Sequence, residues 1–300
     1  MYKVDRISKG GFNFLELKNT TDNSLARICL EEGGRLQELK FKGVDIIKEQ
    51  PNFDYTNSYA SAILFPFANR IENGKYTFND KKFQFDCNNN TNALHGLVYN
   101  KKFKFLEKEL SSNNCSVTIY YSEEKGCRAF PYTYSIFLTY TLSKEKIELN
   151  VTIKNEDFKA FPFTLGWHPY FVSENLQASS LNFKATKKVV FDENLITKKL
   201  EDYTTKGVFE IENKKLDDCF ILKNNKIQFS TPTYKIQLSS NSKETFLQLY
   251  TPKNIPTIAI EPMTGISNSF NNKIGLQILK PNEEYKLIWN VAFNKKIISV

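Results

Sequence analysis

The chain has 300 residues, 41% of them hydrophobic and 14% aromatic, a composition typical of a folded globular protein and unlike that of a disordered one. No stretch approaches the roughly 18 consecutive apolar residues that a membrane span requires, so we expect no membrane partner. The formal net charge is +8 at pH 7, but the lysines are spread along the chain without a basic tract, and we therefore expect no nucleic-acid partner.

Cysteine usage and the N-terminal segment bear on the compartment. The five cysteines form no C-x-x-C pair and no dense cluster, which is typical of free thiols in a reducing cytoplasm and unlike a zinc site. Residues 1–17 carry charges every few positions and contain no apolar segment of the kind found in signal peptides. We therefore predict a cytoplasmic protein without a metal centre.

Polar and apolar residues alternate along most of the chain, which predicts strands. Residues 75–85 (KYTFNDKKFQF) predict a short hairpin with an Asn-Asp turn. Residues 132–142 alternate strictly, and the alternation resumes at 147–153 after a polar turn, which predicts a long antiparallel hairpin. A further strand is expected within residues 283–293 (EEYKLIWNVAF).

Helical periodicity is nearly absent. No stretch keeps a 3.6-residue period for more than about two turns, so we expect helices to be few and short. No Pro- or Gly-rich linker divides the chain, and no internal repeat is visible. The sequence therefore predicts one all-β domain over residues 1–300, built as a large sandwich of antiparallel sheets.

Two candidate functional residues occur in the first third of the chain. Arg70 follows an apolar run (LFPFANRI, residues 64–71), where a cation must face a pocket or a carboxylate. His95 directly precedes Gly96, where the missing side chain would let a ligand approach the backbone. Each of these two signals is weak alone.

The other histidine of the chain lies in TLGWHPYF, residues 164–171. Read as extended chain, Leu165 and Trp167 point one way and anchor the segment in the core, while Gly166 and His168 point the other way. Pro169 disfavours a helix at this point. The pattern predicts the wall of a cleft, although a partly buried structural histidine fits the motif equally well.

Carboxylates follow later in the chain. Glu261 ends the apolar strand of IPTIAIEPMTG (residues 255–265), where a carboxylate is either a rim residue or a functional base. Asp217 and Asp218 come directly before a strand that begins at Cys219.

Taken together, these segments resemble the aldose 1-epimerase (galactose mutarotase-like) family. The resemblance covers roughly residues 30–290, and the motifs occur in the order of the family. They are NRIENGKYTFNDKKFQF, NALHGLVYNKKF, TLGWHPYF, LDDCF, LQLYTP, and IEPMTG followed by NSFNN. The resemblance implies a β-supersandwich with an open cleft across one sheet, an isomerase that acts on a sugar, and no cofactor.

The resemblance also implies residue roles. Glu261 matches the general base that takes the proton from the C1 hydroxyl, and His168 matches the acid that protonates the ring oxygen. His95 matches a second imidazole near the ring oxygen, and Arg70 matches an arginine that holds sugar hydroxyls. Asp217 matches a hydroxyl-binding aspartate, with Asp218 left open as its alternative. Two further residues are implied only as neighbours of the cleft: Tyr250 and Trp289.

Alternative functions stay open. A hexose-6-phosphate 1-epimerase would need further cations, and Lys101 and Lys102 follow His95 closely; a free aldose is favoured because phosphate sites usually recruit arginine, and only Arg70 is well placed. A non-catalytic carbohydrate-binding protein has no need of Glu261 together with a histidine. A two-histidine, one-carboxylate metal site is disfavoured because the chain lacks an H-x-D/E stretch. The sequence indicates neither the preferred sugar nor the oligomeric state.

Overall fold

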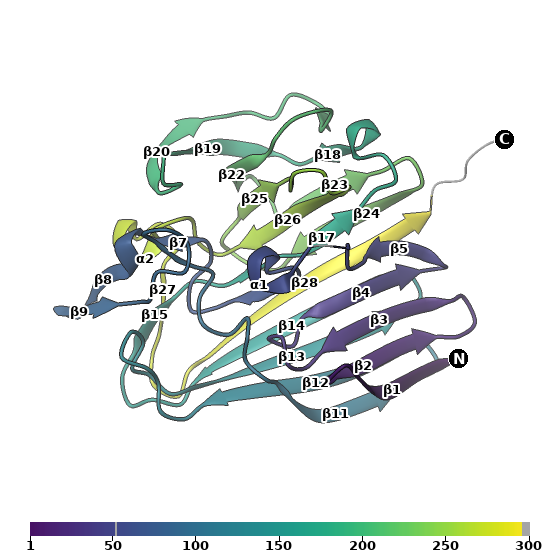
Figure 1. Cartoon of the computed structure of the whole chain (residues 1–300), viewed down its shortest axis with the longest axis horizontal. Helices are drawn as coiled ribbons and strands as arrows, with labels where there is room; N and C mark the ends of the chain where they lie inside the picture. Colours follow the sequence, from purple (N-terminus) through teal and green to yellow (C-terminus); the bar gives the residue numbers. More distant parts are fainter. Residues whose placement is uncertain (52, 296–300) are drawn as a thin grey trace.

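The computed structural model describes residues 1–51 and 53–295, so the last five residues of the predicted 1–300 domain lie outside the described part. Strands dominate it and form three large sheets (Figure 1). The first, N-terminal sheet has the order β1 (Tyr2–Lys9), β2 (Phe12–Asn19), β3 (Ser24–Cys29), β4 (Leu36–Phe41) and β5 (Val44–Ile47).

The second and largest sheet has nine strands. Their order is β11 (Lys104–Leu110), β12 (Asn114–Glu123), β13 (Tyr134–Ser143), β14 (Lys146–Asn155), β28 (Glu284–Lys295), β24 (Tyr234–Ser240), β23 (Lys226–Ser230), β18 (Ser180–Asn182) and β21 (Phe209–Glu210).

The third sheet has eight strands. Their order is β20 (Thr197–Asp202), β19 (Ala185–Phe191), β22 (Asp217–Leu222), β25 (Phe246–Tyr250), β26 (Thr257–Met263), β16 (Gly166–Trp167) and β6 (Ile63–Leu64), with β17 (Tyr170–Val172) also paired to β26.

Smaller elements connect these sheets. Three two-stranded pairs consist of β7 (Arg70–Ile71) with β10 (Ala93–Leu94), β8 (Lys75–Phe78) with β9 (Lys81–Gln84), and β15 (Phe161–Phe163) with β27 (Gln277–Leu279). The helices of the described chain are short: α1 (Tyr55–Ser58), α2 (Ser269–Asn272) and the 3₁₀ turns Glu72–Gly74 and Leu176–Ala178.

The predicted hairpins are confirmed. β13 and β14 pair antiparallel up to Leu142 and Ile147. The turn between β8 and β9 has Asn79 at a φ of 47° and Asp80 at a φ of 60°, the left-handed conformation that two-residue hairpin turns require. The all-β sandwich of antiparallel sheets with few helices is therefore the observed architecture.

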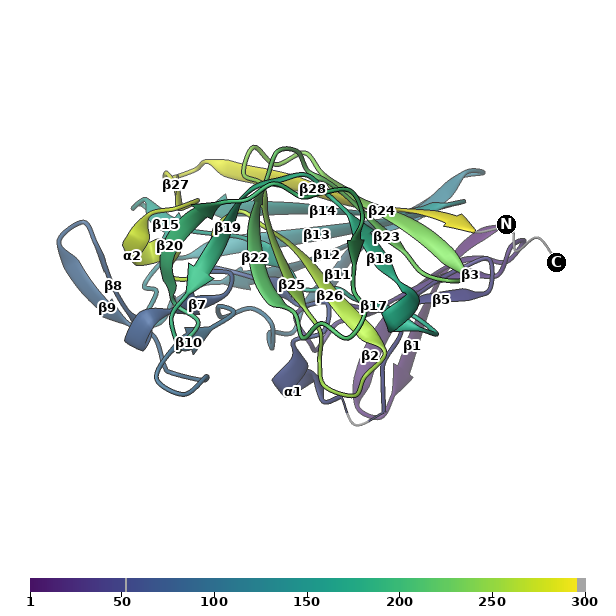
Figure 2. The same ribbon diagram turned by 90° about the horizontal axis from the view of Figure 1, so that it is seen from above.

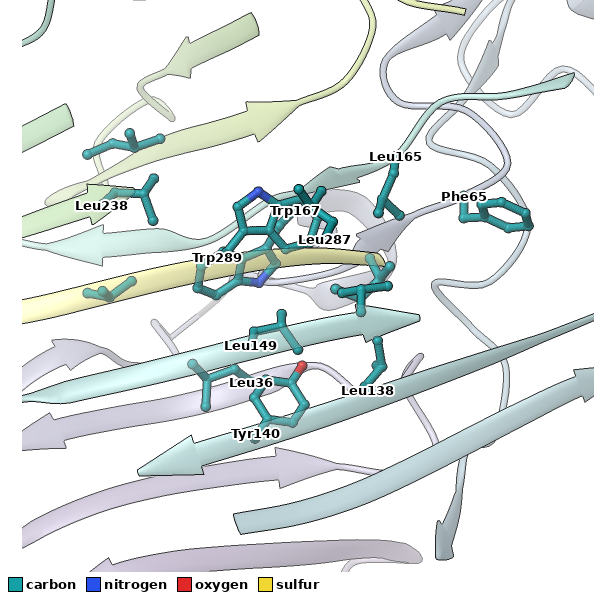
Figure 3. Packing of buried hydrophobic residues seen from close by; sticks show 14 of the residues in the cluster. Leu36, Phe65, Leu138, Tyr140, Leu149, Leu165, Trp167, Leu238, Leu287 and Trp289 are labelled. Atoms are coloured by element: carbon teal, nitrogen blue, oxygen red, sulfur yellow. The ribbon is translucent and has the colours of Figure 1, made fainter. Parts of the chain in front are cut away.

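The three large sheets are layered. β1 and β2 of the N-terminal sheet pack on β12 of the nine-stranded sheet. In Figure 2 the strands β22, β25 and β26 lie below the long strands β14 and β28, with α1 below them. Trp167 of β16 packs on Trp289 of β28, with ring centroids 5.9 Å apart and planes at 28° (Figure 3). Side chains from all three sheets join in one hydrophobic cluster. Because the sheets share this core, one domain stays our prediction.

No helix within the described residues is both long enough and apolar enough to cross a membrane.

Candidate active site

Three neighbouring strands, β26, β25 and β22, form the floor of the site and present two different faces. Their register puts Glu261 opposite Gln248, and Tyr250 opposite Asp217. Because side chains alternate along a strand, the residues at the intervening positions of these three strands point to the other face. There they join the core: Phe220, Leu247, Leu249, Ile258 and Ile260. A register slip of one residue would place Glu261 in the core, so the apolar alternation specifies the site.

His168 comes from the short connection between β16 and β17. Its backbone N–H donates to the carbonyl of Ala62 (3.1 Å), and its carbonyl accepts from the N–H of Ser61 (2.8 Å). The neighbouring Trp167 belongs to the core, so the imidazole lies on the opposite side of the extended backbone, as the sequence predicts. Tyr170 stacks on this imidazole, with ring centroids 5.0 Å apart and planes at 23°.

A cavity of about 250 Å³ lies over this floor. The structure brings all five predicted site residues together on its wall: Arg70, His95, His168, Asp217 and Glu261. The other lining residues are mostly polar or aromatic: Asn57, Ser58, Tyr59, Asn69, Asn89, Leu94, Tyr170, Gln248 and Tyr250. Pockets for drug-sized ligands hold roughly 300–1,000 Å³, so this cavity fits one small polar molecule.

Glu261 and His168 are in direct contact. Glu261 Oε1 and His168 Nε2 lie 3.3 Å apart, and both residues are buried. Burial raises the pKa of the Glu261 carboxyl well above its ordinary value; Asp217 adds to this effect, and the Arg70 guanidinium opposes it. Burial also lowers the pKa of His168 to about 4. Both shifts disfavour charge within this pair, and the 3.3 Å between the two atoms suits the transfer of a proton from one to the other.

His95 follows β10 in a strained conformation. Its φ is 63°, and the next residue, Gly96, has a φ of 77°. A Cβ on Gly96 would lie 2.2 Å from the carbonyl oxygen of Phe65, so only glycine fits there. The imidazole lies between Tyr59 and His168, with ring centroids 4.9 and 5.1 Å away.

Burial disfavours the charged form of both imidazoles, and both are incompletely hydrogen-bonded. Burial lowers the pKa of His95 well below its ordinary value, and the charges of His168 and Arg70 add to this effect. Within the described residues, Nδ1 of His95 and Nδ1 of His168 are buried without a hydrogen-bond partner. Buried polar atoms without partners cost free energy unless a ligand or solvent satisfies them, so the site suits a ligand rich in polar groups.

A chain of hydrogen bonds crosses the rest of the cavity wall. Arg70 donates from Nε to Asn89 Oδ1 (3.1 Å) and from a terminal nitrogen to Asn69 Oδ1 (3.1 Å). Asn69 donates to Gln248 Oε1 (3.3 Å), and Gln248 donates to Asp217 Oδ1 (2.7 Å). Burial raises the pKa of Asp217, and Arg70 opposes the shift. The cation and the carboxylate are thus held in fixed orientations through two amide side chains.

The structure decides between the two neighbouring aspartates. Asp217 lines the cavity, whereas Asp218 points to the other face of β22 and pairs with Lys188 at 2.5 Å. Tyr250 lines the cavity as expected. The expectation for Trp289 is wrong, because β28 turns this side chain into the core behind the floor.

The lysines considered for phosphate binding lie elsewhere. Lys102 pairs with Glu31 at 3.1 Å, and Lys101 lines a neighbouring cavity of about 310 Å³. Arg70 is the one lysine or arginine among the described residues that line the site. As to metals, no group of three or more His, Cys, Asp and Glu side chains in the described chain is arranged to hold an ion.

The sequence analysis did not name several of the lining residues. Two of them, Gln248 and Tyr170, could have been found, because each lies two residues from a named residue on an extended segment and so shares its face. Tyr59 was not, because it ends the single turn of α1 with a φ of 52°, which no local pattern in the sequence indicates.

Comparison with known proteins agrees with this architecture. The uncharacterized protein YihR of Escherichia coli (strain K12) is 23% identical over 278 residues, which cover 88% of this chain and 89% of that protein. A galactose mutarotase-like protein from Clostridium acetobutylicum superimposes with a TM-score of 0.88 at 20% identity, covering 98% of this chain and 99% of the other. Galactose 1-epimerase from Lactobacillus acidophilus NCFM gives a TM-score of 0.83 at 17% identity, covering 99% of this chain and 100% of the other.

These solved structures share the fold of this chain. The sequence profile of the family described as Aldose 1-epimerase matches residues 15–291, nearly the whole chain and every residue that lines the cavity. The chain therefore belongs to the aldose 1-epimerase family.

Proposed function

We propose that this protein is an aldose 1-epimerase that interconverts the α and β anomers of a free, unphosphorylated aldose by opening and closing its ring. The observation that carries the proposal is the buried contact of 3.3 Å between Glu261 and His168 in a small polar cavity. A base and an acid that share one proton are what a hemiacetal needs in order to open.

The reaction follows from this pair. Glu261, as carboxylate, takes the proton from the O1 hydroxyl while His168, as imidazolium, gives a proton to the ring oxygen O5. The C1–O5 bond breaks as the C1=O1 double bond forms, which leaves the open-chain aldehyde. Rotation about C1–C2 presents the other face of the aldehyde to the O5 hydroxyl, and the two transfers then run in reverse. Such acid–base groups typically contribute about 10²–10⁴-fold.

The charge of the pair stays constant during the reaction. With one proton shared, the pair is neutral overall whether that proton lies on the carboxyl or on the imidazole. Burial favours the neutral carboxyl, and the nearby Arg70 favours the carboxylate that the reaction needs. Arg70 therefore has two roles: it binds hydroxyl groups and it favours the basic form of Glu261.

Three features support a free sugar over a hexose 6-phosphate. Phosphate sites recruit several strong donors, commonly arginines. The lining contributes one such cation, Arg70, and its guanidinium already donates to Asn69 and Asn89. Lys102 is paired with Glu31. The chain of amides and carboxylate from Arg70 to Asp217 suits uncharged hydroxyl groups instead.

A non-catalytic sugar-binding protein explains the site less well. Burying a carboxylic acid against an imidazole destabilises the fold relative to apolar residues, and simple binding has no need of such a pair.

The cytoplasmic location inferred from the cysteines stays a prediction.

Polarimetry tests the proposal directly. Freshly dissolved α-D-glucose and α-D-galactose should reach their equilibrium rotation faster with the protein than with buffer alone. The same protein carrying His168→Asn should lose the acceleration while keeping its circular dichroism spectrum. If neither sugar responds, glucose 6-phosphate is tested next; a response to the phosphate alone would refute the free-sugar assignment, and silence with all three would refute this epimerase function for common hexoses.

A further inference from the structure

The asparagine-rich loop at residues 87–92 (CNNNTN) contains a side chain that the site itself does not explain. Asn88 is exposed overall, yet its amide group makes three hydrogen bonds. It accepts from the N–H of Leu94 (2.7 Å) and donates to the carbonyl of the same residue (3.1 Å). It also donates to the hydroxyl of Tyr59 (3.1 Å). An asparagine in a solvated loop has no need of this arrangement.

Both partners of Asn88 adjoin His95. Leu94 precedes it in the chain, and the Tyr59 ring meets its imidazole at 64° with centroids 4.9 Å apart. His95 itself depends on such support, because its φ of 63° is unfavourable for a residue with a side chain. Within the described residues its Nδ1 has no partner that would set the direction of the ring.

Asn88 does not line the cavity that contains Glu261. It lines the neighbouring cavity on the other side of Leu94, so a sugar bound beside Glu261 is not in contact with it. Any effect of Asn88 on the reaction must therefore pass through the residues that it holds.

We propose that Asn88 is a positioning residue that fixes the His95 imidazole from two sides, through the backbone of Leu94 and through the ring of Tyr59. The kinetic part of this proposal rests on the proposed function, in which His95 contacts the sugar. The structural part, that Asn88 sets the orientation of one imidazole, holds independently of any activity.

Histidine NMR tests the structural part. The chain has two histidines, so its imidazole spectrum contains two sets of ring signals, and His168→Asn assigns them. Asn88→Ala should shift and broaden the ring signals of His95 in the ligand-free protein, whereas those of His168 should change less. Tyr59→Phe removes the hydroxyl that contacts Asn88 and Tyr99 but keeps both bonds of Asn88 to Leu94, and it should produce a smaller shift of the same signals. If Asn88→Ala does not fold, the Tyr59→Phe spectrum decides; unchanged His95 signals in a folded variant would overturn the proposal.

Kinetics test the functional part. Asn88→Ala removes three hydrogen bonds, none of them to the sugar, so kcat/KM should fall by only about two- to tenfold, comparable to the net effect of one hydrogen bond. In a His95→Ala background the same substitution should have no further effect, because the proposal routes the influence of Asn88 through His95 and not directly through Tyr59 or Leu94. An equal loss in both backgrounds would overturn the proposal.

Asn113→Ala is the matched control. This asparagine is exposed in the turn between β11 and β12, and its side chain makes no hydrogen bond within the described structure, so the substitution should leave both spectrum and rate unchanged. If the wild-type protein accelerates no anomerisation, the proposed function fails while the NMR result still decides the role of Asn88.

Discussion

Asp217 and Asp218 adjoin in the chain but point to opposite faces of β22. Asp217 accepts a hydrogen bond from Gln248 in the cavity, at 2.7 Å, whereas Asp218 pairs with the partly exposed Lys188. The two residues thus provide a matched pair for testing the site, since the same substitution one position apart changes different surroundings.

Asp217→Asn should lower kcat/KM about ten- to hundredfold, because a hydrogen bond from a sugar hydroxyl to a charged group is lost. Asp218→Asn should leave the rate unchanged and alter the free energy of unfolding by less than about 1 kcal/mol, the usual value of an exposed ion pair. Polarimetry and urea unfolding measure the two effects. A slow Asp218→Asn variant beside a fast Asp217→Asn variant would reverse the assignment.

Glu261→Gln should lower kcat by about 10²–10⁴-fold at pH 7, because the base is lost. It should also raise Tm at neutral pH. Burial raises the pKa of Glu261 in the folded state, so the unfolded chain ionises this carboxyl first and is stabilised relative to the folded state as the pH rises above the ordinary pKa of a glutamate. Glutamine cannot ionise, and each unit of pKa shift corresponds to about 1.4 kcal/mol.

Calorimetry at pH 5 and pH 8, with both proteins, measures this difference in stability. The gain in Tm of the Glu261→Gln variant should be larger at pH 8. An equal Tm difference at the two pH values would mean that the carboxyl titrates normally.

His168 should make the fold sensitive to acid. Its pKa is lowered from 6.5 to about 4 in the folded state, so below pH 6.5 the unfolded chain binds a proton that the folded one does not. The wild-type protein should therefore lose about 3 kcal/mol between pH 6.5 and pH 4 through this residue alone. His168→Asn should lack that part of the loss. Urea unfolding at pH 7 and pH 4.5 compares them, and parallel losses in the two proteins would contradict the shift.

Arg70→Gln and Arg70→Lys should separate charge from geometry. Both variants lose the guanidinium that Asn69 and Asn89 hold in place. A charged hydrogen bond to a sugar hydroxyl is then lost, so KM should rise by about tenfold in both. Only Arg70→Gln removes the positive charge that lowers the pKa of Glu261. Its pH–rate profile should therefore keep activity to higher pH, since the shared proton is lost later, while Arg70→Lys keeps the wild-type profile. Identical profiles for the two variants would exclude the second role of Arg70.

Trp289→Phe should change stability and not rate. The indole packs on Trp167 in the core, and a smaller ring leaves unfilled space there, which typically costs about 1–3 kcal/mol. The value of kcat/KM at 25 °C should stay within about twofold of wild type, because the indole belongs to the core and does not line the cavity. A large change in KM would contradict this assignment and indicate that Trp289 contacts the substrate.

Period-two alternation made most of the fold predictable. The hairpin of β13 and β14 and the strand β28 follow directly from it, because each has one face in the core. Trp289 was misplaced although its own strand gave the answer: it alternates in phase with Leu287 and Val291, which are core residues. The family resemblance implied Trp289 as a neighbour of the cleft, whereas the alternation of its own strand requires burial in the core.

The lining of the cavity was predictable where a polar side chain interrupts an apolar pattern, as at Glu261 and His168. The lining was not predictable where the position of a side chain depends on backbone geometry that has no local sequence signal. Tyr59 reaches the cavity through a left-handed residue at the end of α1, and Asn88 reaches Leu94 across a loop. Such contacts depend on the tertiary path of the chain and leave no periodic signal.

The two-faced floor has a consequence for changing this protein. Gln248, Tyr250 and Asp217 line the cavity from one face of β25 and β22, and the opposite face of these strands carries apolar contacts of the sandwich. If the proposed function holds, substitutions at these three positions change the hydrogen-bond partners offered to sugar hydroxyl groups, and they remove no side chain from that packing. Variants that differ only at these three positions should therefore differ in the sugar that they prefer while keeping a Tm close to that of the wild type.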